Sequence, residues 1–176
     1  MYYLPFYKNQ QGFVGHVLGG WELSGIGYLN SGLHYTASAS TFSQDHAGLG
    51  LNGATFSGAR PDIIGNPQQG APHTINQWIN TSAFAFVPST EIRPGNEHHG
   101  TIEGPPTVRW DANLYKNTNL TERLRLQFRA EAFNVTNHTN WGGFRSLRYS
   151  PTNTLFGKIA SAHDARVMQL SLKLIF

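Results

Sequence analysis

Four residues close together in the sequence carry side chains that could bind a metal ion. Glu97, His98, His99 and Glu103 are of the types that ligate zinc. A zinc site needs three or four ligands that converge at about 2.0–2.3 Å, whereas adjacent histidines on an extended segment point apart. We therefore expect these residues to lie in a solvated loop, and we predict no metal site.

Two further patterns contain the letters of known catalytic or cofactor motifs. Ser161, His163 and Asp164 are the residue types of a hydrolase triad, but a triad depends on geometry that near neighbours in one loop rarely provide. GLGLNG at 48–53 matches the dinucleotide fingerprint, yet the breaker-rich run ATFSGARPD follows it where a helix is required. The sequence predicts no catalytic residue and no cofactor, so we do not expect an enzyme.

The charged residues of the C-terminal half follow a two-residue period, which predicts β-strands. From Leu124 to Ala132 the even positions are apolar and the odd positions are polar, and the same alternation runs from Met168 to Phe176 and around Trp110. Each segment is about the 9–11 residues that a tilted strand needs to cross a bilayer. We predict the last strands at about 107–118, 122–137 and 165–176.

Strands of this kind have one face for lipid and one for a shared polar interior. The alternation predicts that the lipid-facing side chains are Trp110, Leu114, Leu124, Leu126 and Phe128. It predicts that the lumen-facing side chains are Arg109, Asp111, Arg125, Arg129 and Glu131. These charged groups could contact a substrate or a plug; we favour cross-strand ion pairs on a wet inner wall.

The composition excludes several classes of protein. Only 13% of residues are charged, about half the usual share in a soluble domain. A mean hydropathy of −0.35, with 12% aromatic residues, shows that apolar and polar residues are finely interleaved. No apolar run is long enough for a membrane helix. The net charge of +3 is scattered, which argues against a nucleic-acid partner, and the absence of cysteine excludes disulfides.

The links between strands alternate between short and long. Two N-terminal strands are predicted, one at 2–7 and a long Gly-rich one at 15–37 that its glycines could weaken or bulge. The long stretches at about 39–105 and 139–164 are expected to be extracellular loops, and the short links to be periplasmic turns. Within the first loop, NQWINTSAF (76–84) could form a helical turn with Asn76 as its N-cap.

The predicted fold is all-β: an antiparallel meander of about five to six long strands over residues 1–176. So few strands cannot close a membrane barrel, so we expect an incomplete segment of an outer-membrane β-barrel. The first residues, MYYLPFYKNQQGF, lack the regions of a signal peptide. Either the chain is cytoplasmic or its export signal lies further upstream.

Several blocks of sequence resemble one receptor family. RWDANLYKNTNLTERLRLQFRAEAFNVTNHTNW (109–141) and TLFGKIASAHDARVMQLSLKLIF (154–176) resemble the last strands of Oar-like TonB-dependent receptors, which often carry a carboxypeptidase-regulatory-like domain. LPFYK (4–8), LGGWELSGIGYLNSG (18–32), RPDIIGNP (60–67) and WINTSAF (78–84) follow the order of that family. The resemblance covers nearly the whole chain.

The resemblance implies a location, a role and partners. It implies a bacterial outer-membrane location, contact with outer-membrane lipid and active uptake of an unknown nutrient ligand by the parent receptor. This chain shows no plug and no TonB box, so contact with the TonB complex would come only through a missing N-terminal part, and the fragment would not transport alone. It also implies a C-terminal signal for the barrel-assembly machinery, formed by Met168, Leu170, Leu172, Leu174 and Phe176.

The large aromatic residues leave one alternative open. Trp21, Trp110, Trp141 and Phe144 could belong to the aromatic girdles of a membrane barrel, and the resemblance favours this for Trp110 above all. A soluble all-β binding module for a carbohydrate or protein would bury the same residues in a core. Leu124 and Leu170 would then be sealed by a second layer.

Overall fold

The computed structural model describes residues 1–39 and 59–176. They form two compact units, each built from separate stretches of the chain. Unit 1 contains residues 1–30, 107–140 and 164–176, and unit 2 contains residues 31–106 and 141–163. No helix among the described residues is long and apolar enough to cross a membrane.

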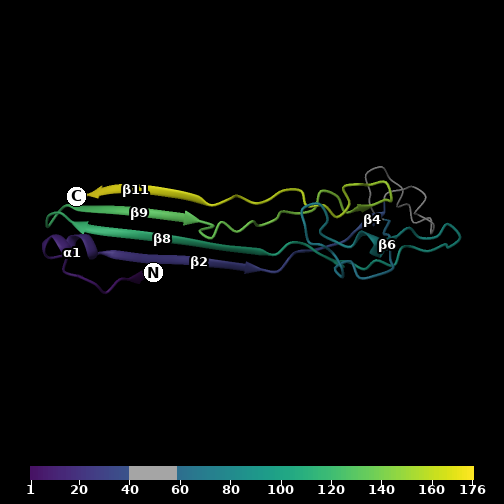
Figure 1. Cartoon of the computed structure of the whole chain (residues 1–176), viewed down its shortest axis with the longest axis horizontal. Helices are drawn as coiled ribbons and strands as arrows, with labels where there is room; N and C mark the ends of the chain where they lie inside the picture. Colours follow the sequence, from purple (N-terminus) through teal and green to yellow (C-terminus); the bar gives the residue numbers. More distant parts are fainter. Residues whose placement is uncertain (40–58) are drawn as a thin grey trace. The chain divides into compact units, whose positions relative to one another are not determined.

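Unit 1 is a five-stranded antiparallel sheet in the order β1-β2-β8-β9-β11. Four of its strands are long and lie side by side in Figure 1. The strands are β1 (Tyr2–Tyr3), β2 (Trp21–Asn30), β8 (Thr107–Asn119), β9 (Arg125–Phe133) and β11 (Val167–Ile175). The prediction of an all-β antiparallel segment is confirmed, and every end of the last three strands lies within four residues of the predicted end.

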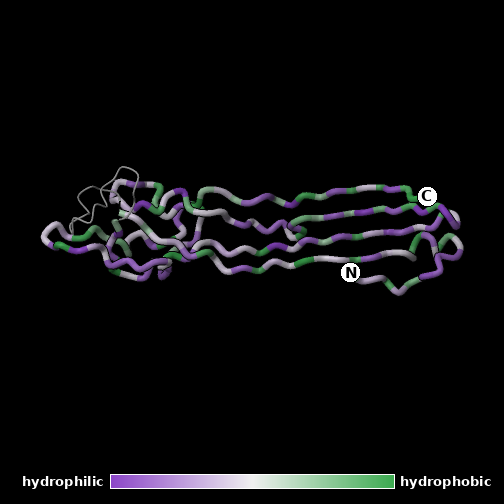
Figure 2. Tube along the Cα trace, turned by 180° about the vertical axis from the view of Figure 1, so that it is seen from behind, coloured by the Kyte–Doolittle hydropathy of each residue, from purple (hydrophilic) through white to green (hydrophobic). Residues whose placement is uncertain are grey.

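The register keeps the two-residue period in phase across the sheet. Leu114 of β8 faces Ala130 of β9, which faces Leu170 of β11. One residue further along, Tyr115 faces Arg129, which faces Ser171. Apolar and polar residues alternate along β9, β11 and most of β8, and Figure 2 shows hydrophobic and hydrophilic stretches interleaved along the tube. One face of the sheet is apolar and the other is polar.

The expected single strand at 15–37 is wrong at both ends, because β2 spans only Trp21–Asn30. Helix α1 (Gly12–Leu18) occupies its first residues, and β2 begins only at Trp21. Gly25 and Gly27 do not bulge β2, because its pairing with β8 is continuous from Trp21 to Asn30. Gly27 instead provides room for an aromatic ring, since a Cβ there would lie 2.5 Å from Trp110.

Unit 2 combines short strands with a hydrophobic core of its own. Its elements are β3 (His34–Tyr35), β4 (Ser38–Ala39), β5 (Asp62–Ile63), η2 (Thr81–Ala83), β6 (Phe84–Ala85), β7 (Ile102–Glu103) and β10 (Arg148–Tyr149). They pair as β3 with β7 and β5 with β6, both antiparallel, and β10 with β4, in parallel. The core contains Ala37, Trp78, Ile79, Ala83, Phe84, Ile102, Phe156 and Ile159.

Both long connections contribute to this core. Phe156 packs edge-on against Phe84, with ring centroids 5.1 Å apart, although the two residues come from different connections. The predicted helical turn at 76–84 is present only as the short 3₁₀ turn η2. Its cap is Asn80, whose side chain accepts a hydrogen bond from the Ser82 N–H, and not the predicted Asn76. The expected loops are therefore a folded unit.

We predict that Gly157→Ala destabilises unit 2 more than Gly70→Ala does. Both glycines have φ above +70°, so each substitution costs about 1 kcal/mol in the left-handed region. Only at Gly157 would the new Cβ meet a buried side chain, 2.6 Å from Ile79, which adds about 1 kcal/mol of overpacking. Hydrogen exchange of unit 2 amides measures the loss of stability in each variant. Equal losses in the two variants would contradict this packing argument.

Candidate functional site

The polar face of the sheet holds a hydrogen-bonded row that crosses three strands. Arg129 on β9 donates from Nε to Gln127 Oε1 at 2.7 Å. Gln127 donates to Asn117 Oδ1 on β8 at 2.8 Å, and Asn117 donates to Glu22 Oε1 on β2 at 2.6 Å. Each side chain in the row is oriented by its neighbour, so this face presents fixed donors and acceptors to whatever it meets.

The charged residues of this face are not paired as the sequence predicted. Arg109 forms its ion pair with Asp111 along β8, at 2.8 Å, and the pair does not cross to another strand. The register gives the reason: the ladder between β8 and β9 begins at Ala112, and Glu131 faces Asn113. The guanidinium of Arg129 lies instead over the ring of Tyr115, and Arg125 donates to Asn119.

The apolar face carries most of the residues predicted to meet lipid. Trp110 and Leu114 lie on β8, and Leu126 and Phe128 lie on β9 in register with Leu174 and Leu172. The side chain of Leu170, at the middle of β11, is 66% exposed. A soluble sandwich would cover such a face, and no second layer covers it among the described residues.

Two predicted residues lie outside the strands. Leu124 precedes β9, and its carbonyl accepts hydrogen bonds from the N–H groups of Leu120 and Thr121 in the turn. Phe176 follows β11 and is 96% exposed. The apolar side chains of β11 that belong to the predicted assembly signal are Met168, Leu170, Leu172 and Leu174, and all are at least half exposed.

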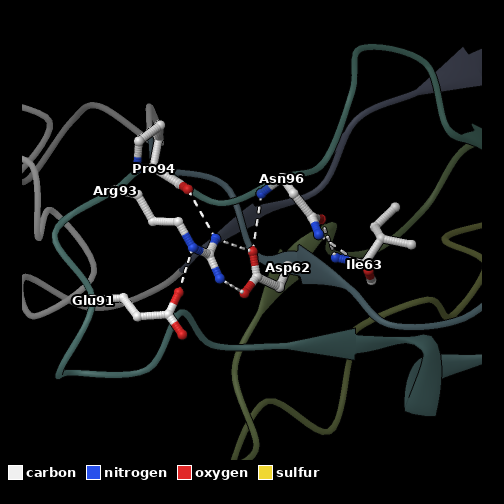
Figure 3. Close-up of polar contacts among 6 residues, drawn as sticks. All are labelled: Asp62, Ile63, Glu91, Arg93, Pro94 and Asn96. Atoms are coloured by element: carbon white, nitrogen blue, oxygen red, sulfur yellow. Dashed lines mark hydrogen bonds and ion pairs between the residues drawn. The ribbon is translucent and has the colours of Figure 1, made fainter.

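In unit 2, the nearly buried carboxylate of Asp62 accepts three hydrogen bonds (Figure 3). Arg93 contacts Asp62 through both terminal nitrogens, at 2.7 Å each, and its Nε donates to Glu91. The backbone N–H of Asn96 donates to Asp62 at 3.0 Å, and the Asn96 side chain bonds both the N–H and the carbonyl of Ile63. The Arg93 guanidinium lowers the pKa of Asp62, so the carboxylate stays charged and ties β5 to residues 91–96.

Glu97 is a second buried carboxyl, but its side chain forms no ion pair among the described residues, and Arg60 donates only to its main-chain carbonyl at 3.1 Å. Its Oε1 accepts from the Ala37 N–H at 2.7 Å and from the Thr101 hydroxyl at 2.8 Å. Its Oε2 is buried without a hydrogen-bond partner among the residues described. Burial raises the pKa of Glu97 above its usual 4.5. The expectation that 97–103 is a solvated loop is therefore wrong for Glu97, which is 3% exposed.

We predict that unit 2 loses stability as the pH rises because of Glu97. The folded unit holds this proton more tightly than the unfolded chain does, so the contribution is complete below pH 4.5 and is lost as the pH rises through the raised pKa. Glu97→Gln removes this pH dependence. Free energies of opening from hydrogen exchange between about pH 5 and 8 provide the test; an equal slope in both proteins would contradict it.

One protein-family model matches most of this chain. The model of an outer membrane beta barrel domain matches residues 1–169. The chain belongs to this family. No curated protein and no solved structure matches it. The five-stranded sheet is therefore part of an outer-membrane β-barrel, and the protein is located in the bacterial outer membrane.

The tryptophans of this barrel segment divide between the two units. Trp21 and Trp110 lie on the apolar face, six residues apart in the register, because Trp21 faces Lys116 and Trp110 faces Gly27. That separation is about 20 Å along the strands, which is shorter than the roughly 9–11 residues that a tilted strand needs to cross the bilayer, so the two tryptophans do not lie at opposite edges of the apolar band. The girdle assignment is wrong for Trp141 and Phe144, which pack against the core of unit 2.

The metal pattern at 97–103 does not form a site in the described parts of the chain. No group of three or more His, Asp or Glu that could hold a metal ion occurs there. Ser161 and His163 belong to unit 2, whereas Asp164 belongs to unit 1. The GLGLNG pattern at 48–53 lies outside the described residues.

Sequence reasoning missed the ordered polar residues of unit 2 and the pocket beside them. The pocket has a volume of about 490 Å³ and is lined by Arg60, His99 and Arg148, with hydroxyl groups from Thr36, Ser38 and Ser146. Such a lining offers donors to an anionic or hydroxyl-rich molecule. The signal available in the sequence was the block RPDIIGNP, whose Asp62 and Ile63 form β5.

Proposed function

We propose that this chain is the C-terminal end of the barrel of an Oar-like TonB-dependent receptor, which takes up a nutrient across the outer membrane. The observation that carries the proposal is the combination of a two-faced sheet with two long connections that fold into one unit. Large plugged transporters of this membrane combine a barrel with long extracellular loops. The sequence blocks that resemble this family support the finer identity.

In this proposal the apolar face of the sheet meets lipid and the polar face lines the lumen. A transmembrane barrel must satisfy its backbone groups through closed pairing. Among the described residues, β11 pairs only with β9, so further strands must close the ring. Unit 2 is then extracellular, and its basic pocket is the described part of the loops that could contact the nutrient.

The upstream reading frame and a binding experiment test this function. We expect the DNA ahead of Met1 to encode further barrel strands, a plug and a TonB box. The complete protein, purified from outer membranes, should bind the periplasmic domain of TonB, and a peptide with the TonB-box sequence should compete. A promoter and start site directly before Met1, or a complete protein that does not bind TonB, would overturn the proposal.

A further inference from the structure

Helix α1 presents an apolar arc away from the rest of unit 1. At 3.6 residues per turn, four apolar side chains of α1 fall within about 140° of its circumference. They are exposed: Phe13 by 84%, Val14 by 52%, Val17 by 46% and Leu18 by 49%. On the opposite side of the helix Gly15 is buried, and a Cβ there would lie 2.9 Å from the Gln10 backbone.

The direction of this arc is fixed by contacts with β2 and β8. The Gln10 side chain donates to the Asn117 carbonyl at 2.8 Å and accepts from the Asn119 N–H at 3.2 Å. Gly20, with φ of +75°, lies so close to β8 that a Cβ would be 2.1 Å from the Asn117 carbonyl oxygen. The Trp21 indole donates to the Val17 carbonyl at 3.1 Å. The exposed arc is therefore held in place.

Trp21 joins α1 to the apolar face of the sheet, because its indole donates to the Val17 carbonyl. Trp21 is two residues before Leu23 on β2, so both side chains lie on the same face of the sheet. Leu23 pairs with Leu114, which belongs to the apolar face, and Trp21 pairs with Lys116. The Lys116 ammonium lies 5.2 Å from the centre of the Trp21 ring and donates to the Gly19 carbonyl. A tryptophan and a lysine at the end of an apolar band are typical of the level of lipid headgroups.

We propose that α1 lies in the periplasmic headgroup region of the outer membrane, with Phe13 and Val17 inserted among phospholipids. This inference rests on the proposed assignment of the apolar face to lipid. The occupant is phospholipid because α1 contacts Trp21, which lies on that face, and because Lys116, next to Trp21, places a cation near phosphate groups. A short amphipathic helix binds such an interface by burying its apolar side.

Probes attached to single cysteines can test where α1 lies. This chain contributes no cysteine, so Phe13→Cys, His16→Cys and Leu170→Cys can each carry one fluorophore in the complete receptor. His16 is on the same helix but outside the apolar arc. The receptors are reconstituted in vesicles of phosphatidylethanolamine and phosphatidylglycerol that contain nitroxide lipids, labelled either near the headgroup or deep in the acyl chain. Heat-modifiable mobility in gels confirms that each variant is folded.

We expect headgroup nitroxides to reduce the emission at position 13 about twofold and at position 16 little, because only the first lies in the interface. Deep nitroxides should quench position 170 most. If position 170 is quenched but position 13 is as accessible to water as position 16, the inference fails and the face assignment stands. If position 13 is shielded from water without quenching by lipid, a protein segment covers it and the inference also fails. Absence of quenching at position 170 overturns the face assignment itself.

Discussion

Leu170→Arg should destabilise the assembled barrel by about 3 kcal/mol, because it places a charge on the lipid face near the middle of a strand. Leu170 lies at the centre of β11, with Ala130 and then Leu114 beside it in register. Its side chain is 66% exposed in the described chain. In a bilayer, that exposed surface would be in hydrocarbon, where a guanidinium loses its hydration.

The matched control is Gln169→Arg, the same new charge one residue away. Gln169 faces Glu131 on the polar face, so the added guanidinium gains an acidic neighbour and remains in water. We expect this variant to destabilise the assembled barrel by less than about 1 kcal/mol. The measurement is the urea midpoint of the complete barrel in phospholipid vesicles, together with the folded fraction after assembly. Equal losses for the two variants would show that the two faces do not have the proposed environments.

The long C-terminal strands could be predicted because their evidence is local. Alternation over nine or more residues fixes both the strand and the face of each side chain, as with Leu170 and Gln169. Helix α1 could not be predicted in the same way. FVGHVL is a short apolar run, which fits a buried strand and a helix equally well. The contacts that position this helix are non-local: Gly20 lies close to β8, and the Gln10 side chain donates a hydrogen bond to the Asn117 carbonyl.

Unit 2 was harder to predict because its contacts join distant parts of the chain. Phe84 meets Phe156, and Asp62 meets Arg93, across intervals that no local pattern encodes. A useful signal was nevertheless present in the length of the first connection. Structureless loops of that length are uncommon in compact proteins, so the length of this connection predicts that it contains folded segments. The ion pairs predicted on the sheet failed for a related reason, since they depend on the register at Ala112.

The second large effect is expected at the ion-pair cluster of unit 2, where Arg93→Met should cost about 3 kcal/mol. The substitution removes both guanidinium bonds from Asp62, whose side chain is 7% exposed. It leaves a carboxylate that is nearly buried and retains only the Asn96 N–H. The estimate is at the lower end for a broken buried pair because Arg93 itself is 38% exposed.

Glu91→Gln is the control, because it changes the other acidic partner of the same guanidinium. The Glu91 side chain is 45% exposed, so we expect a loss of stability below about 1 kcal/mol.

Acid should reduce the difference in stability between Arg93→Met and the parent protein. The lowered pKa of Asp62 contributes stability that is present above pH 3.8 and is lost as the pH falls through the folded value. Protease cleavage of unit 2 in the complete receptor, followed over pH, measures both effects. If Glu91→Gln costs as much as Arg93→Met, the stabilisation arises from the surface pair and not from neutralising Asp62.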